Sequence, residues 1–281
     1  MFIIKLISKL PLSWLYGIAD FASFILCYLV PYRKKLVRRN LQRAFPYKDQ
    51  KYLKAVEKKF YKNLCDYGVE TIKAYSISKE ELSKRVTFIL PQDETFGKQA
   101  IIGLASHQFN WEWLMLAGCI QLGMPMEFVY QPLKQKSTDR FMKRLRSRFG
   151  GRPVKRNKVA SEAIRRKNEV RIIALVADQF PGKANDKRYW TQFLGRETAF
   201  YQGIDQLVRL TQYPVYHFGI RKVKRGYYEC HINKIASPPY SPSQSVLDAY
   251  IKATERMIKQ EPEGWLWSHN RWKKSRQKAD A

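Results

Sequence analysis

Residues Ala100–Leu116 read AIIGLASHQFNWEWLML, and the interpretation of the rest of the chain depends on this stretch. The apolar run Ala100–Ala105 predicts a buried strand, and Ser106–Asn110 predicts a sharp polar turn before a helix. His107 therefore lies where the strand ends, and Glu112 follows five residues later. Open α/β sheets bind their ligands beyond the carboxyl ends of their strands. The pattern indicates a functional site at this turn.

An imidazole beside a carboxylate can serve as a general base with an orienting partner. His107 could take a proton from a hydroxyl group, and we expect Glu112 to fix its tautomer and to stabilise the imidazolium. The spacing alone is weak support, because a histidine that caps a helix beside a surface glutamate gives the same pattern. The sequence around the turn has to separate these two interpretations.

The composition narrows the class of protein. The 281 residues suit one large domain or two small ones, and 45% hydrophobic residues are enough for a substantial core. The formal charge of +28 implies an anionic partner, which could be nucleic acid, an anionic membrane surface, or an acidic protein or lipid. The four cysteines are scattered without a C-x-x-C pair, so we expect reduced thiols, no metal site and no cofactor.

Residues Leu10–Tyr32 form an apolar stretch of the length that spans a bilayer. Asp20 near its middle would cost about 2.5–3.5 kcal/mol there, so a tilted or half-embedded helix and a buried soluble helix remain alternatives. Six basic residues follow at once between Arg33 and Arg43, whereas only Lys5 and Lys9 precede the stretch. This bias places the body of the protein in the cytoplasm. We expect a membrane anchor over residues 1–35 and a catalytic domain over 36–281.

Apolar periodicity further along predicts an alternation of helices and strands. Helices are expected over Asp49–Tyr75, from Ser78, and over Ser137–Arg148, Ile204–Thr211 and Ser243–Ile258. Strands are expected over Val86–Leu90, Met126–Tyr130, Val170–Ala177, Tyr213–Ile220 and Tyr227–Ile232. The fold class is α/β, with a mixed central sheet flanked by helices. Asp178 directly follows one strand, so parallel strands would bring it to the same sheet edge as His107.

The segment Lys134–Lys158 holds eleven basic residues and one acid, Asp139. Nucleic-acid binding competes with lipid binding as an explanation. However, the segment has no helix-turn-helix, RNP or zinc-finger pattern, and few aromatic residues on which bases could stack. We therefore expect no nucleic-acid partner.

The motif SHQFNWEW resembles the His-x4-acid motif of the lipid A late acyltransferases, the lauroyl/myristoyl family related to the glycerolipid acyltransferases. The resemblance covers about Arg38 to Lys274, and Phe109 departs from it, since many members have glycine there. Four further segments are similar to the family: RRNLQRAFP (Arg38–Pro46), VYQPLKQKSTDRFMKRLRSRFGG (Val129–Gly151), ALVADQ (Ala174–Gln179) and WLWSHNRWK (Trp265–Lys273).

The resemblance implies O-acyl transfer from an acyl thioester, carried by acyl carrier protein or coenzyme A, to a hydroxyl of an anionic lipid such as a lipid A precursor. It implies catalysis by His107 and Glu112, with Arg146, Asp178 and Asn110 binding substrate or the developing oxyanion. The expected location is the cytoplasmic face of the bacterial inner membrane. No Gly-x-Ser-x-Gly elbow is present, so no covalent acyl-enzyme is needed.

Two alternatives remain open from the residues. A non-catalytic basic protein that binds membrane or nucleic acid would use the same charge without needing His107 and Glu112 to meet at a strand end. An acyl hydrolase would use the same pair on water and would release fatty acid without an acceptor.

Overall fold

A computed structural model describes residues 2–30, 32–182, 186–243 and 245–274 of the chain. Among these residues, seven strands form one sheet in the order β1-β9-β8-β2-β5-β3-β4, and two more form a hairpin. The sheet contains β1 (Val86–Ile89), β2 (Ile101–Ala105), β3 (Met126–Tyr130), β4 (Arg152–Lys155), β5 (Ile172–Val176), β8 (Val215–Lys224) and β9 (Tyr227–Ala236), and the hairpin contains β6 (Arg188–Phe193) and β7 (Arg196–Tyr201).

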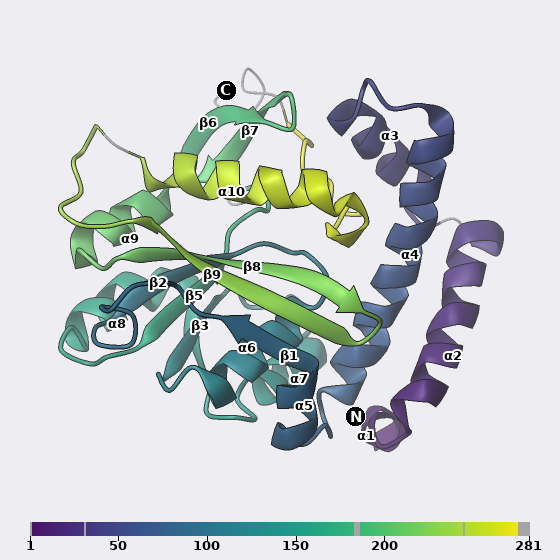
Figure 1. Ribbon diagram of the computed structural model, residues 1–281, viewed down its shortest axis with the longest axis horizontal. Coiled ribbons are helices and arrows are strands. Elements are labelled where there is room, and N and C mark those ends of the chain that lie inside the picture. The colour runs from purple at the N-terminus through teal and green to yellow at the C-terminus, as the bar shows by residue number, and fades with distance from the viewer. Residues whose placement is uncertain (1, 31, 183–185, 244, 275–281) are drawn as a thin grey trace.

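Helices cover both faces of the sheet, with α10 on one side and α5, α6 and α7 on the other (Figure 1). The helices are α1 (Phe2–Ser8), α2 (Leu12–Phe24), α3 (Lys34–Ala44), α4 (Gln50–Lys73), α5 (Lys79–Arg85), α6 (Trp111–Gln121), α7 (Lys136–Arg146), α8 (Val159–Arg165), α9 (Gly203–Thr211) and α10 (Val246–Gln260), with short turns η1 (Ile25–Leu29), η2 (Arg156–Lys158) and η3 (Pro262–Gly264). Each face carries its own buried apolar cluster.

Strand β2 lies at the centre of the sheet, parallel to β5 on one side and to β8 on the other. Its residues Ile101, Ile102 and Leu104 are fully buried, as expected for a parallel strand covered on both faces. Gly103 allows close packing there, because a Cβ at that position would lie 2.9 Å from Cε2 of Phe218. The first part of the central motif is therefore held rigidly by its neighbours.

The expected α/β class with a mixed sheet is confirmed: every pairing in the large sheet is parallel except that of β8 with β9. The predicted strands and helices are present with boundaries shifted by a few residues. The elements that were not predicted include the helices α1, α3 and α8 and the strand β4. Of these, β4 and α8 lie in or directly after the basic segment Lys134–Lys158, where charged residues hide the apolar pattern.

The N-terminal apolar stretch forms α2 and the π-helical turn η1, and residues Leu12–Leu29 are long and apolar enough to cross a membrane by length and composition. This helix stands beside α4 at the edge of the molecule (Figure 1). Asp20 is not isolated, since its carboxylate binds Arg225 from the β8–β9 turn at 2.8 Å. One face of α2 is thus attached to the body, and the opposite face exposes apolar side chains such as Trp14 and Phe21.

Candidate active site

The turn after β2 is built by a helix cap and a strained residue. Asn110 precedes α6, and its Oδ1 accepts a hydrogen bond of 2.9 Å from the backbone N–H of Trp113. Such caps satisfy one of the open donors at a helix start. Phe109 has a φ of 47°, in the left-handed region that favours glycine. The departure from glycine noted in the sequence therefore leaves the turn geometry in place at some cost in backbone strain.

The segment after α10 holds the same turn through its backbone. The N–H of Phe109 donates to the carbonyl of Gly264 at 2.8 Å, and the N–H of Leu266 donates to the carbonyl of His107 at 3.1 Å. Gln108 and Trp265 form an isolated antiparallel bridge between these bonds. Residues far apart in the sequence thus form a short two-stranded clamp around the histidine.

His107 is paired with Asp178. Its Nδ1 lies 2.6 Å from Oδ1 of Asp178, and its backbone N–H lies 3.1 Å from both carboxylate oxygens. The indole N–H of Trp265 donates to Oδ2 at 2.7 Å. Burial opposes ionisation of this carboxyl, but the charge of His107 and these hydrogen bonds outweigh it and lower the pKa of Asp178 to about 2.

An ionised Asp178 can only accept hydrogen bonds, so the ring proton of neutral His107 lies on Nδ1 and Nε2 carries the free lone pair. The contacts differ from the expected ones. Asp178, predicted to bind substrate or an oxyanion, is the carboxylate hydrogen-bonded to His107. Glu112, predicted to orient His107, contacts Arg146 instead.

Glu112 is fully buried and forms a two-pronged ion pair with Arg146. The Nε of Arg146 donates to Oε2 at 2.9 Å and its Nη2 donates to Oε1 at 2.6 Å, while the indole N–H of Trp111 donates to Oε1 at 3.1 Å. Burial acts to lower the pKa of Arg146, but the hydrogen bonds and charge of Glu112 raise it above its usual value. The carboxylate therefore holds the arginine, not the histidine.

Asn110 is also placed differently from the expectation. It is fully buried, its Oδ1 caps α6, and its Nδ2 donates to the carboxylate of Glu70 at 2.7 Å. Both polar atoms of the Asn110 side chain thus make contacts that hold the turn, and Asn110 is not among the residues that line the cavity described below.

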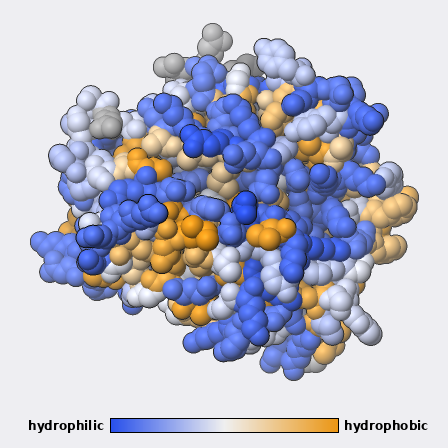
Figure 2. Space-filling view, in the orientation of Figure 1, coloured by the Kyte–Doolittle hydropathy of each residue, from blue (hydrophilic) through white to orange (hydrophobic). Residues whose placement is uncertain are grey.

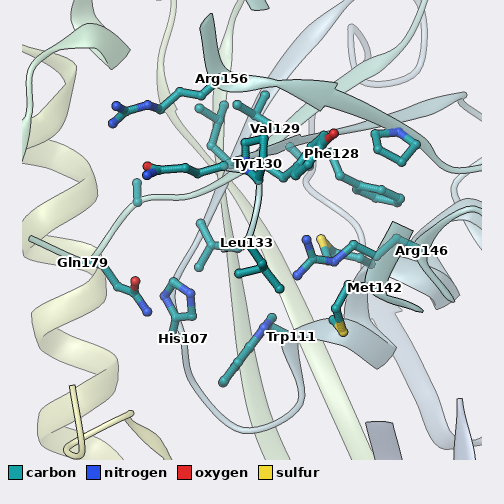
Figure 3. Close-up of a pocket in the computed structure, with 18 of the residues that line it drawn as sticks. His107, Trp111, Phe128, Val129, Tyr130, Leu133, Met142, Arg146, Arg156 and Gln179 are labelled. Carbon is teal, nitrogen blue, oxygen red and sulfur yellow. The ribbon is translucent and has the colours of Figure 1, made fainter. Parts of the chain in front are cut away.

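A cavity of about 740 Å³ opens beside this turn. His107 and Trp111 lie at its floor, Met142 and Arg146 on one side, and Gln179 on the other (Figure 3). Phe128, Val129 and Tyr130 of β3 lie opposite the floor, and Leu133 from the loop after β3 also lines the cavity. The cavity therefore combines apolar walls with a few polar groups, as small-molecule sites usually do.

Among the described residues, no group of three or more His, Cys, Asp or Glu side chains could hold a metal ion. Trp265 was identified from the sequence only as part of the segment WLWSHNRWK, with no role at the site. Trp265 and Trp267 are buried, and Trp265 contacts Asp178. The available signal was the high density of tryptophans in this segment, which is unusual for an exposed tail.

Comparisons with known proteins identify the family of the chain. A family model described as bacterial lipid A biosynthesis acyltransferase matches residues 1–274. No curated protein matches the chain. One solved structure, the 1-acyl-sn-glycerophosphate acyltransferase PlsC from Thermotoga maritima, is 14% identical over 88% of this chain and 96% of that one, with a TM-score of 0.38. Because the family model spans nearly the whole sequence, the chain belongs to the bacterial lipid A biosynthesis acyltransferase family.

Proposed function

We propose that the protein transfers a fatty acyl chain from a thioester donor to a hydroxyl group of a lipid A precursor. The single observation that carries the mechanism is the His107–Asp178 pair at the floor of an apolar cavity. Asp178 fixes the proton on Nδ1, so Nε2 can remove the proton of the acceptor hydroxyl. The hydroxyl oxygen then attacks the thioester carbonyl, the carbon–sulfur bond breaks, and the imidazolium returns its proton to the thiolate that leaves.

Arg146 supplies positive charge near the reacting groups. Glu112 occupies its Nε and Nη2, and we assign Nη1 to the oxyanion that develops on the thioester carbonyl or to a phosphate of the acceptor. In this mechanism Glu112 fixes the guanidinium and compensates part of its charge. Loss of Glu112 would release the arginine, so both residues contribute although neither acts as the base.

The acyl chain of the donor is assigned to the apolar part of the cavity. Phe128, Met142 and Leu133 offer the kind of surface on which each buried methylene contributes about 0.8 kcal/mol. The donor carrier is assigned as acyl carrier protein, because its acidic surface suits a chain with a charge of +28. Acyl-coenzyme A is the alternative that the same cavity would admit.

We infer that α2 lies in one leaflet of the inner membrane at its cytoplasmic face and does not cross the bilayer. Its inner face is attached to the body by Asp20–Arg225, and the turn before it is attached by Lys73, whose Nζ donates to the carbonyl of Leu10 at 2.9 Å. A spanning position would break these contacts. The outer face exposes apolar side chains, including Trp14 (68% exposed) and Phe21 (67% exposed). Figure 2 shows a hydrophobic patch at the right-hand edge of the molecule, the side on which α2 lies in Figure 1.

A flotation assay with vesicles tests this membrane mode. Wild-type protein should float with vesicles that contain anionic lipid, and Trp14→Glu with Phe21→Glu should abolish flotation while leaving the folded body intact by circular dichroism. Tyr47→Glu is a matched control, because Tyr47 is exposed but lies outside α2. Recovery of the double variant in the floating fraction would show that another surface binds the membrane.

Purified protein with acyl carrier protein or coenzyme A thioesters and a lipid A precursor tests the reaction, with products identified by mass spectrometry. The expected result is an acylated acceptor from wild-type protein and a loss of at least about 10²-fold for His107→Ala. Release of free fatty acid without an acylated lipid would assign the pair to hydrolysis. Equal rates for wild type and His107→Ala would refute the mechanism.

A further inference from the structure

Glu70 on α4 is a fully buried carboxylate at the centre of a hydrogen-bonded cluster. It accepts bonds from Tyr16 Oη at 2.7 Å, from Asn110 Nδ2 at 2.7 Å and from Tyr228 Oη at 2.8 Å. Among the residues that the structure describes, no lysine or arginine is ion-paired with it. Burial raises the pKa of Glu70, and the hydrogen bonds from these three neutral donors oppose that rise by stabilising the ionised form.

The Glu70 cluster is directly hydrogen-bonded to the turn Ser106–Asn110, which holds His107 and is called the catalytic turn below. The Nδ2 of Asn110 donates to Glu70, its Oδ1 caps α6, and Asn110 follows His107 by three residues. The backbone carbonyl of Glu70 also accepts the indole N–H of Trp113 at 2.8 Å. Glu70 therefore holds the first turn of α6 at two points, and that turn carries Trp111 and Glu112 into the cavity.

The Glu70 cluster is also directly hydrogen-bonded to the N-terminal helix α2, through Tyr16. Tyr16 lies on α2, on the face opposite to the exposed apolar side chains. The remaining donor, Tyr228 on β9, stays protonated, because burial and the charge of Glu70 raise its pKa well above the usual value. Two hydrogen bonds, from Tyr16 to Glu70 and from Asn110 to Glu70, thus connect α2 with the turn that holds the catalytic base.

We propose that Glu70 is a positioning residue that couples the seating of α2 on the body to the geometry of the catalytic turn. The inference rests on the proposed role of His107 as the base. In this view α2 has a second task besides membrane contact, since its Tyr16 hydroxyl completes the support of the active site. Removing that support displaces the turn without removing any group that touches substrate.

Asp66 provides a matched control on the same helix. It lies one turn before Glu70, is equally buried, and is paired with Lys222 at 3.2 Å and with Arg225 at 2.6 Å. Arg225 also binds Asp20, so Asp66 is linked to α2 as Glu70 is. The contacts of Asp66 lead to the β8–β9 turn and not to the catalytic turn. Comparing variants of Asp66 and Glu70 therefore distinguishes the effect of weakening the attachment of α2 from the effect of displacing the active site.

Steady-state kinetics of the full-length protein with an acyl carrier protein donor tests the proposal, with melting temperature and vesicle flotation measured for each variant. Glu70→Ala should lower kcat by about 10²-fold, the usual effect of a displacement of about 1 Å at a reacting group, with little change in the donor KM. Glu70→Gln should restore most of the rate, because its carbonyl can still accept from Asn110 and its amide can donate to the Tyr16 oxygen. Asp66→Asn should keep kcat within a few-fold of wild type.

Tyr16→Phe keeps the proposal testable if Glu70→Ala does not fold, since it removes only one hydroxyl. It should lower kcat by about tenfold, the effect of losing one hydrogen bond to a charged group, and leave vesicle flotation unchanged. A wild-type kcat for Tyr16→Phe, or equal kcat losses for Glu70→Ala and Asp66→Asn, would overturn the coupling. An inactive wild-type protein would instead contradict the proposed function. If the wild type is active and His107→Ala is inactive, the proposed function stands, and either of the two results above then contradicts only the role assigned to Glu70.

Discussion

Replacing Asp178 by asparagine tests the assignment of the histidine tautomer. In the wild type, Oδ2 accepts from the Trp265 indole and both oxygens face the backbone N–H of His107, while Oδ1 faces Nδ1. The asparagine oxygen should take the place of Oδ2, because the indole and backbone donors require an acceptor. The amide NH₂ is then turned toward Nδ1, which must accept, and the ring proton moves to Nε2.

With the proton on Nε2 the imidazole cannot take the hydroxyl proton, so the general-base contribution is lost. That contribution is typically 10²–10⁴-fold, and Asp178→Asn should lower kcat by about this factor with an unchanged donor KM. The assay is steady-state acyl transfer, with Trp265→Phe as a partner variant. Once the indole donor is absent, the amide of an Asp178→Asn/Trp265→Phe double variant can rotate and regain part of the lost rate.

The reasoning fails if Asp178→Asn keeps more than about a tenth of the wild-type kcat, because a base in the wrong tautomer cannot sustain that rate. It also fails if the double variant is slower than the product of the two single losses predicts. Either result would mean that Asp178 acts only by holding the turn, through the backbone N–H of His107.

Three further predictions concern charge, strain and pH. Arg146→Ala should lower kcat and Arg146→Lys should not restore it, whereas Arg144→Ala should raise KM in a way that high salt reproduces, since screening weakens only long-range attraction. If kinetics at low and high salt are the same for Arg146→Ala and Arg144→Ala, Arg146 acts only through long-range attraction. Phe109→Gly should relieve backbone strain of about 1 kcal/mol yet lower the free energy of unfolding by about 2 kcal/mol or more, because the ring packed on Gly264 is lost; urea unfolding measures this. The pKa of Asp178 is lowered from 3.8 to about 2, so its ionisation contributes about 2 kcal/mol above pH 4 that disappears as the pH falls toward 2; urea unfolding of wild type, but not of Asp178→Asn, should show this part of the acid slope.

The sequence predicted the sheet edge at which the site lies, but not every pair of side chains that is in contact there. His107 and Asp178 were both expected beyond the ends of parallel strands, and the register pairs Ala105 with Val176, two residues before each of them. Parallel pairing therefore brings the two side chains together, as the apolar runs indicated. The partner of Glu112 could not be predicted in this way, because the helix cap at the turn sets its direction and Arg146 comes from a separate helix.

The N-terminal helix illustrates the same limit. Its apolar length was correctly identified, but the sequence treated Asp20 as an unpaired charge in a possible span. The partner, Arg225, is 205 residues away at the tip of a strand turn. Local patterns in the sequence reveal the period and length of a helix. The face by which α2 attaches to the body depends on the long-range ion pair of Asp20 with Arg225, and no local pattern encodes that pair.

The clamp between the catalytic turn and the segment Gly264–Leu266 has a consequence for the order of events during synthesis. This segment is translated after every strand of the sheet, since β9 ends at Ala236. A nascent chain can therefore complete its sheet while Trp265, which fixes Asp178, is still missing. The strands alone therefore do not complete the arrangement of His107, Asp178 and Trp265, which also needs the segment that leaves the ribosome after them.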